Sequence, residues 1–296
     1  MWIQAAGPLT ESVFHLTTAV STHALIVGDE SAIVDASISA ASERVIEQIG
    51  AHLGQDVALD FIFLTHSHFD HLGGIPALRA HYADLQVIGG PQTSELLSDT
   101  GFVEHCYEKN LVYAEAAQVK LGMDKKQWCE AIRIDRIMGD GDLLQIGDDV
   151  EVKLLSSPGH SVDCVAYFVQ PDGVLACGEA LGSYAGRDKV ASCFSADFES
   201  YIGSLQKLSG LDVQALCLPH SGAISGEMVP KFFLEARLAA DRFRDDVRER
   251  LEQGQLVDEI FDSLLPEWQA EKIAPEGPFA DEQQETLRMM IKASSV

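Results

Sequence analysis

Basic residues are scarce in this sequence. Its 296 residues contain 21 Lys and Arg against 46 Asp and Glu, which gives a formal net charge of −25. Such a charge argues against a protein that holds nucleic acid or an anionic membrane through a broad basic face. No apolar run approaches the ~18 residues of a membrane-spanning helix. The first twenty residues contain no Lys or Arg, so no signal peptide is predicted. We therefore expect a cytoplasmic protein that binds neither nucleic acid nor membranes.

Several common motifs are also absent. The six cysteines include no CxxC pair, which excludes a zinc ribbon and a thioredoxin-type redox site. Cys177 and Cys217 lie in apolar runs, which predicts buried free thiols in a reducing compartment. There is no GxSxG motif, no phosphate-binding loop and no GxGxxG motif after a strand. A serine triad and a nucleotide site of either kind therefore have no support.

The sequence does contain a strand-rich pattern that a helical segment interrupts. Short apolar runs predict strands at 24–27, 32–34, 61–64, 86–88, 150–155, 165–169, 174–177 and 215–218. Between 92 and 138, apolar and charged residues mix at helical spacing and no strand is predicted. Helices are predicted again at 230–253, 256–265 and 281–291. We predict a domain over residues 1–225, with a helical insertion at about 92–138, and a helical extension over 226–296. This extension would cover the site or mediate association, for example in a homodimer.

The densest group of potential metal ligands directly follows the apolar run Phe61–Leu64. Residues 65–71 read THSHFDH and supply four ligands in six residues: His66, His68, Asp70 and His71. His66 and His68 are two apart on an extended segment, so their side chains can point the same way. Asp70 and His71 are adjacent and must point differently, which suits a second metal. A chance cluster of surface histidines would not be expected to be this dense at the end of a strand.

Three further candidate ligands each follow an apolar strand. His160 comes after Val152–Leu155, Glu179 after Val174–Cys177, and His220 after Ala215–Leu218. A single His at the end of a strand is more often a cap or a surface residue. Several such side chains at the ends of neighbouring strands are how sheet proteins build a site on a rigid scaffold. This mixture of imidazole and carboxylate suits zinc, and iron and manganese also accept it.

The motifs and their order resemble the metallo-β-lactamase-fold hydrolases over roughly Phe14 to Gly222. The resemblance implies an α/β protein with an αββα sandwich, in which two sheets lie face to face with helices outside. It also implies two divalent metal ions. One would be held by His66, His68 and His160, the other by Asp70, His71 and His220, with Glu179 bridging them and Asp35 supporting the ligands. The family usually has Asp at the bridging position, and Glu moves the carboxylate by about 1–1.5 Å. The spacing, identity and occupancy of the metals are therefore in question.

A site of this kind implies hydrolysis. Two cations held close together lower the pKa of a bridging water, so that hydroxide attacks an ester-like carbonyl and one metal stabilises the oxyanion. Asp70 could also take part in proton transfer. Within the family, the insertion and tail resemble glyoxalase II-type thioesterases and the quinolone-signal response protein, the latter over Thr65–Pro76, Cys177–Gly182 and Ala196–Tyr201. The implied substrate is a small-molecule thioester or carboxylic ester.

Other functions compete with this one. A lactonase would use the same attack, and the motif does not separate the two. The negative charge disfavours the RNA-processing phosphodiesterases of the family, and no flavin or haem motif supports iron redox chemistry. A regulatory or interaction protein with a bound metal and weak hydrolase activity is a different class. Glu179 and the helical tail leave that class open.

Some residues near these motifs have two interpretations. The helix at 230–253 carries Arg237, Arg242, Arg244, Arg248 and Arg250. They form either a solvated face paired with acids at helical spacing or a surface for anions or a second copy. An anionic substrate such as an acyl-CoA would need a basic pocket, and this helix is the first place to expect one. Phe69, Tyr184 and Phe194 line a pocket or belong to the core, and His81 and His105 are expected to be structural.

Overall fold

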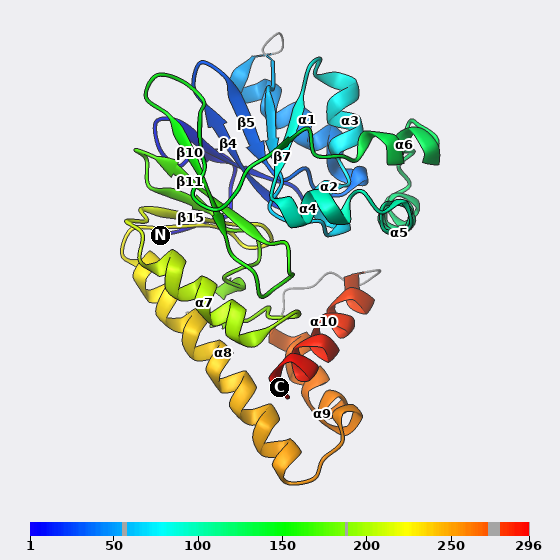
Figure 1. The fold of residues 1–296 in the computed structure, drawn as a ribbon, viewed down its shortest axis with the longest axis vertical. Coiled ribbons are helices and arrows are strands. Elements are labelled where there is room, and N and C mark those ends of the chain that lie inside the picture. Colours follow the sequence, from blue (N-terminus) through cyan, green and yellow to red (C-terminus); the bar gives the residue numbers. More distant parts are fainter. Residues whose placement is uncertain (55–57, 187–188, 272–278, 296) are drawn as a thin grey trace.

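The computed structural model describes residues 1–54, 58–186, 189–271 and 279–295. Two sheets lie face to face, with helices on both outer faces (Figure 1). The first sheet has the order β2 (Gly7–Pro8), β3 (Val13–Thr17), β4 (Thr22–Val27), β5 (Ser31–Val34), β6 (Phe61–Phe63), β7 (Gln86–Gly89) and β8 (Arg136–Ile137). The second has the order β1 (Trp2–Ile3), β16 (Gly222–Ser225), β15 (Ala215–Leu218), β12 (Val174–Ala176), β11 (Val165–Gln170), β10 (Glu151–Ser156) and β9 (Leu143–Gln145). A small ribbon pairs β13 (Ser183–Gly186) with β14 (Lys189–Ala191).

The helices cover the two sheets separately. Those of the first half of the chain are η1 (Ser39–Ala41), α1 (Ser42–Leu53), α2 (Phe69–Leu72), α3 (Ile75–His81), α4 (Pro91–Leu96), α5 (Thr100–Ala116) and α6 (Lys125–Ala131). Those of the second half are α7 (Phe198–Ser209), α8 (Met228–Glu252), α9 (Val257–Glu271) and α10 (Phe279–Ser294). Figure 1 shows α1 and α3 beside the first sheet and α7 and α8 beside the second. The predicted αββα sandwich is confirmed.

Alternating side chains explain why the sheets stack. On β11, Val165, Tyr167 and Val169 face the other sheet, and Ala166 and Phe168 face the helices of the C-terminal half. Successive side chains of a strand point to opposite faces, so a strand that is apolar throughout is buried on both sides. A central core therefore lies between the sheets, and an outer core lies between each sheet and its helices.

Strand direction brings the loops with candidate ligands to one edge of the sandwich. The strands β5, β6 and β7 run parallel, so the segments after β5 and β6 leave the first sheet at the same edge. In the second sheet β12 and β15 are parallel, which does the same for the segments after them. Parallel strands share their carboxyl-end edge, and this edge is where α/β proteins place their sites.

Direct hydrogen bonds between the sheets fix their relative position at this edge. The Tyr167 hydroxyl on β11 donates to the Leu64 carbonyl after β6, with an O···O distance of 2.9 Å. The backbone N–H of Val165 donates to the Thr65 carbonyl at 2.8 Å, and that of Thr22 to the Pro219 carbonyl at 2.6 Å. These bonds lie beside the ligand-bearing loops, so the two halves of the site are tied together by the scaffold itself.

The structure differs from the sequence predictions in short elements. The insertion at 92–138 is helical through α4, α5 and α6, but it ends in the two-residue strand β8, so the prediction that it contains no strand is wrong. A strand this short has no periodicity to detect, and it forms because Ile88 and Gly89 of β7 offer a parallel edge. The cysteines are free thiols, all buried except the half-buried Cys129. No helix in the described part of the chain combines the length and apolar character needed to cross a membrane.

Candidate metal centre

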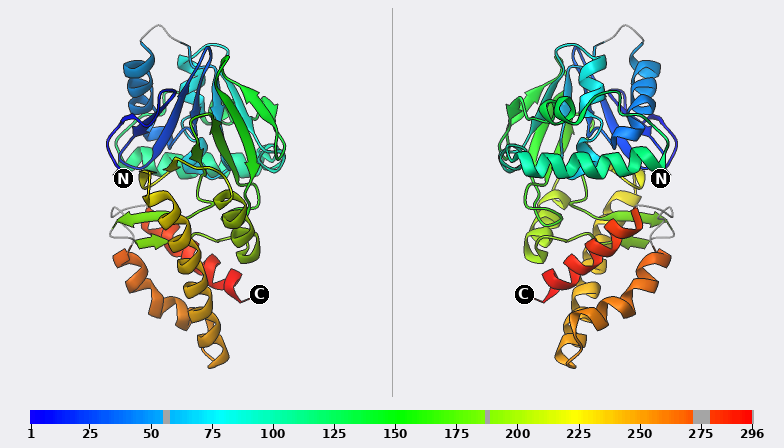
Figure 2. Two further views of the ribbon diagram at one scale, coloured as in Figure 1. Left: turned by 90° about the vertical axis from the view of Figure 1, so that its left-hand side faces the viewer. Right: turned by 90° about the vertical axis from the view of Figure 1, so that its right-hand side faces the viewer.

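A cavity of about 580 Å³ opens at the edge where the ligand-bearing loops meet. Candidate ligands lie at its base, and its walls come from the loop before β4, from α5, from the β13–β14 ribbon and from α10. Figure 2 shows α5 crossing below the sandwich, and Figure 1 shows α10 between α5 and α9. The volume lies within the range of about 300–1,000 Å³ usual for small-molecule sites.

The Glu179 carboxylate lies at the centre of the ligand cluster. Its Oε2 is 2.9 Å from His160 Nε2 and 3.4 Å from both His66 Nε2 and His71 Nε2. Its Oε1 is 3.6 Å from His220 Nε2. One carboxylate thus lies near four imidazoles that come from three separate segments, after β6, β10 and β15.

The remaining ligands complete two neighbouring groups. The His68 Nδ1 lies 3.0 Å from His160 Nε2. The Asp70 Oδ2 lies 3.9 Å from His71 Nε2 and 3.5 Å from His220 Nε2. The two groups able to hold a metal ion are His66, His68, His160 and Glu179, and Asp70, His71 and His220. All seven predicted ligands therefore come together, although they lie as far apart in sequence as residues 66 and 220.

Hydrogen bonds on the outer side of the rings aim the histidines inward. The Nδ1 of His160 donates to the Cys193 carbonyl at 3.0 Å, and that of His220 to the Val20 carbonyl at 3.0 Å. A carbonyl accepts only, so each Nδ1 carries a hydrogen and each Nε2 points into the site, where the neutral ring offers a lone pair to a metal. Partners of this kind orient metal-binding histidines and raise their basicity.

Asp35 orients His71 directly and His66 through Thr65. It is 4% exposed, and its carboxylate accepts from His71 Nδ1 at 2.8 Å and from the Thr65 backbone N–H at 2.8 Å. The Thr65 hydroxyl also donates to Asp35, at 2.9 Å. Its one hydrogen is then used, so His66 Nδ1 must be the donor in the 3.0 Å contact with that hydroxyl. Asp35 therefore lies beside the candidate ligands, at the supporting position that the sequence predicts.

Sequence reasoning missed two further supports of the ligand loops. Asp163 is buried and accepts from the Ser67 backbone N–H at 2.8 Å and from the Ser161 hydroxyl at 2.6 Å, so it joins the two histidine-bearing loops. Gly178, before Glu179, has φ +51°, and a Cβ there would lie 3.0 Å from the Thr65 side chain. Glycine adopts this conformation without strain and leaves this space. Neither partnership has a local sequence signal, because the contacts are long-range.

The pKa values of the clustered histidines are shifted in opposite directions. Burial holds the pKa of His66 well below its usual value, and burial together with His160 lowers the pKa of His68 to about 4. Burial opposes charge on His71 as well, but Asp35 and Asp70 outweigh it and hold its pKa well above the ordinary value.

Glu179 and His160 form a buried charged contact. Burial disfavours the charge on both groups, but the attraction between them outweighs burial. The pKa of Glu179 therefore lies well below its usual range and the pKa of His160 well above its own. The protein thus places cationic imidazole around a buried carboxylate where a metal ion would supply the same positive charge.

The structure fits a metal at this place by a second criterion. The Nε2 atoms of His66 and His71 are buried and have no hydrogen-bond partner, although Glu179 is 3.4 Å from each. Buried polar atoms nearly always have partners, and their loss costs about 1–3 kcal/mol each. Two inward-facing imidazole nitrogens without partners, beside a carboxylate, match the donor set of a divalent transition metal.

The cavity walls resolve several open interpretations. Phe69 and Tyr184 line the cavity, whereas Phe194 is fully buried in the core. His105 lines the cavity, so its assignment as purely structural is wrong; helical spacing alone did not reveal that this face of α5 borders a cavity.

The arginines of α8 lie elsewhere. None of the five arginines is among the described residues that line the cavity. The expectation of a basic pocket on this helix is therefore wrong. Acidic partners instead bind Arg237, Arg242, Arg244 and Arg250, and Arg248 donates to the Ser294 carbonyl.

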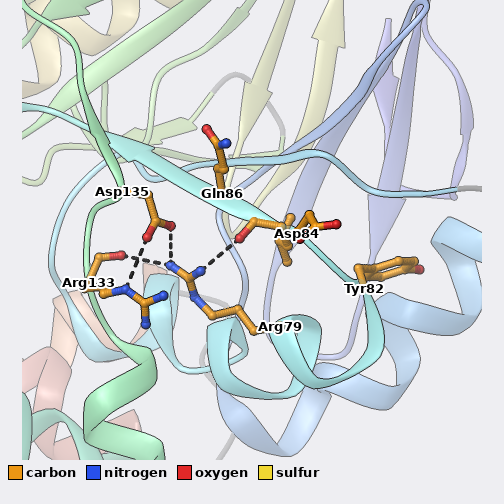
Figure 3. A pocket seen from close by; sticks show the side chains of 7 residues that line it. Arg79, Tyr82, Asp84, Gln86, Arg133 and Asp135 are labelled. Carbon is orange, nitrogen blue, oxygen red and sulfur yellow. Dashed lines mark hydrogen bonds and ion pairs between the residues drawn. The ribbon is translucent and has the colours of Figure 1, made fainter.

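A second hollow of about 470 Å³ lies near α3 and β7 (Figure 3). Arg79 and Arg133 both bind Asp135 there, at 2.5 and 3.2 Å. Arg79 also donates to the Leu85 carbonyl at 2.9 Å. Both arginines are paired within the protein. These contacts hold the end of the insertion against the first sheet.

The fold and the ligand cluster define a metallo-hydrolase class, and comparison with known families agrees. The profile described as "Metallo-beta-lactamase superfamily" matches residues 17–220, more than half of the chain. The chain belongs to the metallo-β-lactamase superfamily, as predicted.

Its relatives include hydroxyacylglutathione hydrolases, the glyoxalase II enzymes. That of Erwinia tasmaniensis is 25% identical over 64% of this chain and 58% of its own length. That of Aliivibrio fischeri is 30% identical over 56% of this chain and 48% of its own length. The chain thus spans about half the length of these relatives. A metallo-β-lactamase superfamily protein from Sulfolobus tokodaii shares the fold, with a TM-score of 0.55, 19% identity and coverage of 93% of this chain and 92% of that one.

Proposed function

We propose that this protein is a metal-dependent hydrolase that cleaves a small-molecule thioester or carboxylic ester at a site for two divalent metal ions. The observation that carries the proposal is the convergence of seven candidate ligand side chains, Glu179 among them, of which five line one cavity. The relatives named hydroxyacylglutathione hydrolase support the hydrolytic reaction and the thioester bond. Residues 1–225 would form the catalytic domain and 226–296 an extension over the site.

The proposed ligand roles follow the two groups described above. One metal, zinc by preference and iron or manganese as alternatives, would be held by His66, His68 and His160, the second by Asp70, His71 and His220, with Glu179 between them. When bound, the metals would supply a water activated near neutral pH and positive charge for the carbonyl oxygen.

The chain's own residues prepare this reaction. Outward hydrogen bonds hold the imidazole rings of His160 and His220 in place before substrate binds, so little reorganisation is needed. Asp70 lines the cavity and can accept the proton that water releases on attack, then pass it to the departing thiolate or alkoxide. The walls from α5 and α10 shield the bond from bulk water.

Metal content is the first test. Protein purified without added metal and analysed by inductively coupled plasma mass spectrometry should contain up to two equivalents of zinc, iron or manganese. Less than one equivalent after reconstitution with each metal would refute the two-metal site.

Activity is the second test. Reconstituted protein should hydrolyse S-acyl-N-acetylcysteamine thioesters or aryl esters, and His68→Ala should lower kcat/KM by about 100-fold or more, since its imidazole is a proposed metal ligand. His81→Ala is the matched control, because His81 is exposed and lies outside the cavity. Hydrolysis of acyl-homoserine lactones instead would identify a lactonase. No turnover above the His68→Ala background would favour a regulatory protein.

A further inference from the structure

The outer wall of the cavity carries negative charge. Helix α10 contributes five residues to it: Glu282, Gln283, Glu285, Thr286 and Met289. Spacings of three, four and seven place these residues on one face of the helix. The adjoining face, with Leu287, Met290 and Ile291, is buried against the helices of the C-terminal half. The face of α10 with Glu282, Glu285 and Thr286 therefore borders the cavity.

Little positive charge balances this wall. Within residues 1–54, 58–186, 189–271 and 279–295, Lys109 of α5 is the only Lys or Arg that lines the cavity. Its ammonium is already paired with Glu282. Glu285 is exposed and has no ion-pair partner among the same residues. The metal ligands aside, the described wall thus has two carboxylates against one ammonium.

The nearest arginine of the same helix is directed away from the cavity. Arg288 donates to Asp258 of α9 at 2.7 Å, and its guanidinium lies 3.7 Å from the centre of the Phe261 ring. A bound guanidinium of this kind is fixed by both charge and stacking. It therefore does not offset the charge of Glu285.

We propose that Glu285 makes this cavity select thioesters or esters whose outer portion, beneath α10, is cationic, and discriminate against those with an anionic outer portion. The inference rests on the proposed function and names its substrate class. Positive charge from bound metals acts at the scissile carbonyl, so the selection concerns the part of the substrate that extends away from it. Carboxylate- and phosphate-bearing groups, such as a nucleotide carrier, would be poor substrates.

Two matched substrate series test this proposal on the metal-reconstituted protein. In the first, one acyl group is joined to thiocholine, N-acetylcysteamine or 3-mercaptopropionate, so that the thiol is cationic, neutral or anionic. In the second, N-acetylcysteamine carries a 4-trimethylammoniobutanoyl, pentanoyl or glutaryl group, so that the acyl side varies. Intrinsic reactivity differs among these compounds, but it cancels when each kcat/KM is divided by that of a variant.

The decisive variant is Glu285→Gln, with Glu252→Gln as control. Glu252 is also exposed, at the far end of α8, so both changes remove one negative charge from the protein. An exposed charge changes the binding of a charged partner by about two- to fivefold. In at least one series, the ratio of cationic to anionic kcat/KM should therefore fall by about tenfold in Glu285→Gln and stay at the wild-type value in Glu252→Gln. The difference should shrink at high salt.

Three outcomes are informative. A wild-type preference for the anionic substrates, or an equal response of both variants in both series, overturns the proposal. If neither these thioesters nor aryl esters are hydrolysed, the proposed function fails, and titration calorimetry with the three free thiols still tests the charge rule. Tighter binding of thiocholine than of 3-mercaptopropionate that is lost in Glu285→Gln would uphold it, and the reverse order would overturn it.

Discussion

Replacing Asp35 by Asn should weaken metal binding without disturbing the backbone. Asp35 has φ +59°, a conformation that Asn tolerates, so the change is confined to one oxygen. All contacts of the carboxylate run to donors: the Thr65 N–H and hydroxyl, and His71 Nδ1. Whichever way the new amide turns, its NH₂ group faces one of these donors.

The sterically simplest response is a change of tautomer at His71. If His71 carries its hydrogen on Nε2, its Nδ1 can accept from the Asn amide, but the lone pair that faces Glu179 is lost. Disturbing one such partner of a metal-binding histidine typically costs 10–100-fold in affinity, which is about 1.4–2.7 kcal/mol. Loss of a charge-assisted hydrogen bond should also lower the stability of the metal-free protein by about 1.5–3 kcal/mol.

Zinc affinity in competition with a chromogenic chelator is the appropriate assay, with urea unfolding of the metal-free protein beside it. Asp60→Asn is the matched control. Its carboxylate accepts from the Ser31 backbone N–H at 2.8 Å, directly before β6 and at the opposite end of that strand from the ligands. Zinc binding by Asp35→Asn within twofold of wild type would refute the reasoning, whereas an equal loss in both variants would point to the scaffold.

Three further predictions follow from other parts of the structure. Burial lowers the pKa of His23 to about 4, so between about pH 6.5 and 4 the unfolded chain binds more protons than the folded one, and the free energy of unfolding should fall by about 3 kcal/mol as the pH falls through that window. Urea unfolding of the metal-free protein at pH 7.5 and 4.5 should show a smaller loss of stability in His23→Gln than in wild type. Removing metal that was held at about 100 times its Kd should cost about 2.7 kcal/mol, and scanning calorimetry with and without chelator should show a lower Tm; an unchanged Tm would contradict a folded-state metal site. Gly159→Ala should destabilise the protein by about 3 kcal/mol or more, because Gly159 has φ +133° and the new Cβ would lie 2.3 Å from Tyr201 Cα. Gly203→Ala lies within α7 with nothing within 4 Å of the new Cβ, so in the same unfolding assay it should stabilise the protein by about 0.5–1 kcal/mol.

The ligand cluster was predictable because its pattern is local and repeated. Each candidate ligand directly follows an apolar run, and strands place their ends where a sheet has its edge. The motif at 65–71 needs no tertiary information to be recognised as a group of ligands. Its outward partners were less accessible. The carbonyls of Val20 and Cys193 hold His220 and His160, but any residue offers a carbonyl, so no residue type marks them.

The cavity walls could not be predicted from the pattern of α10 alone. Amphipathic spacing separates the face of Leu287 and Ile291 from the face of Glu285, but it does not tell water from a cavity. The arginines of α8 illustrate the same limit. Arg237 and Arg250 pair at helical spacing as local reasoning expects, whereas Arg244 reaches Glu199 of α7. Such partners depend on packing between helices, which one sequence does not display.

The distribution of the ligands over both sheets has a consequence for how the protein acquires metal during synthesis. The histidines of the 65–71 segment leave the ribosome early, and His220 follows roughly 150 residues later, a delay of about 8–30 s at 5–20 residues per second. During that interval the nascent chain displays an incomplete, unselective set of donors. Glu179 meets all its imidazole partners only when the second sheet has docked. The complete set of donors, and with it the choice of metal, therefore belongs to the folded sandwich and not to the nascent chain.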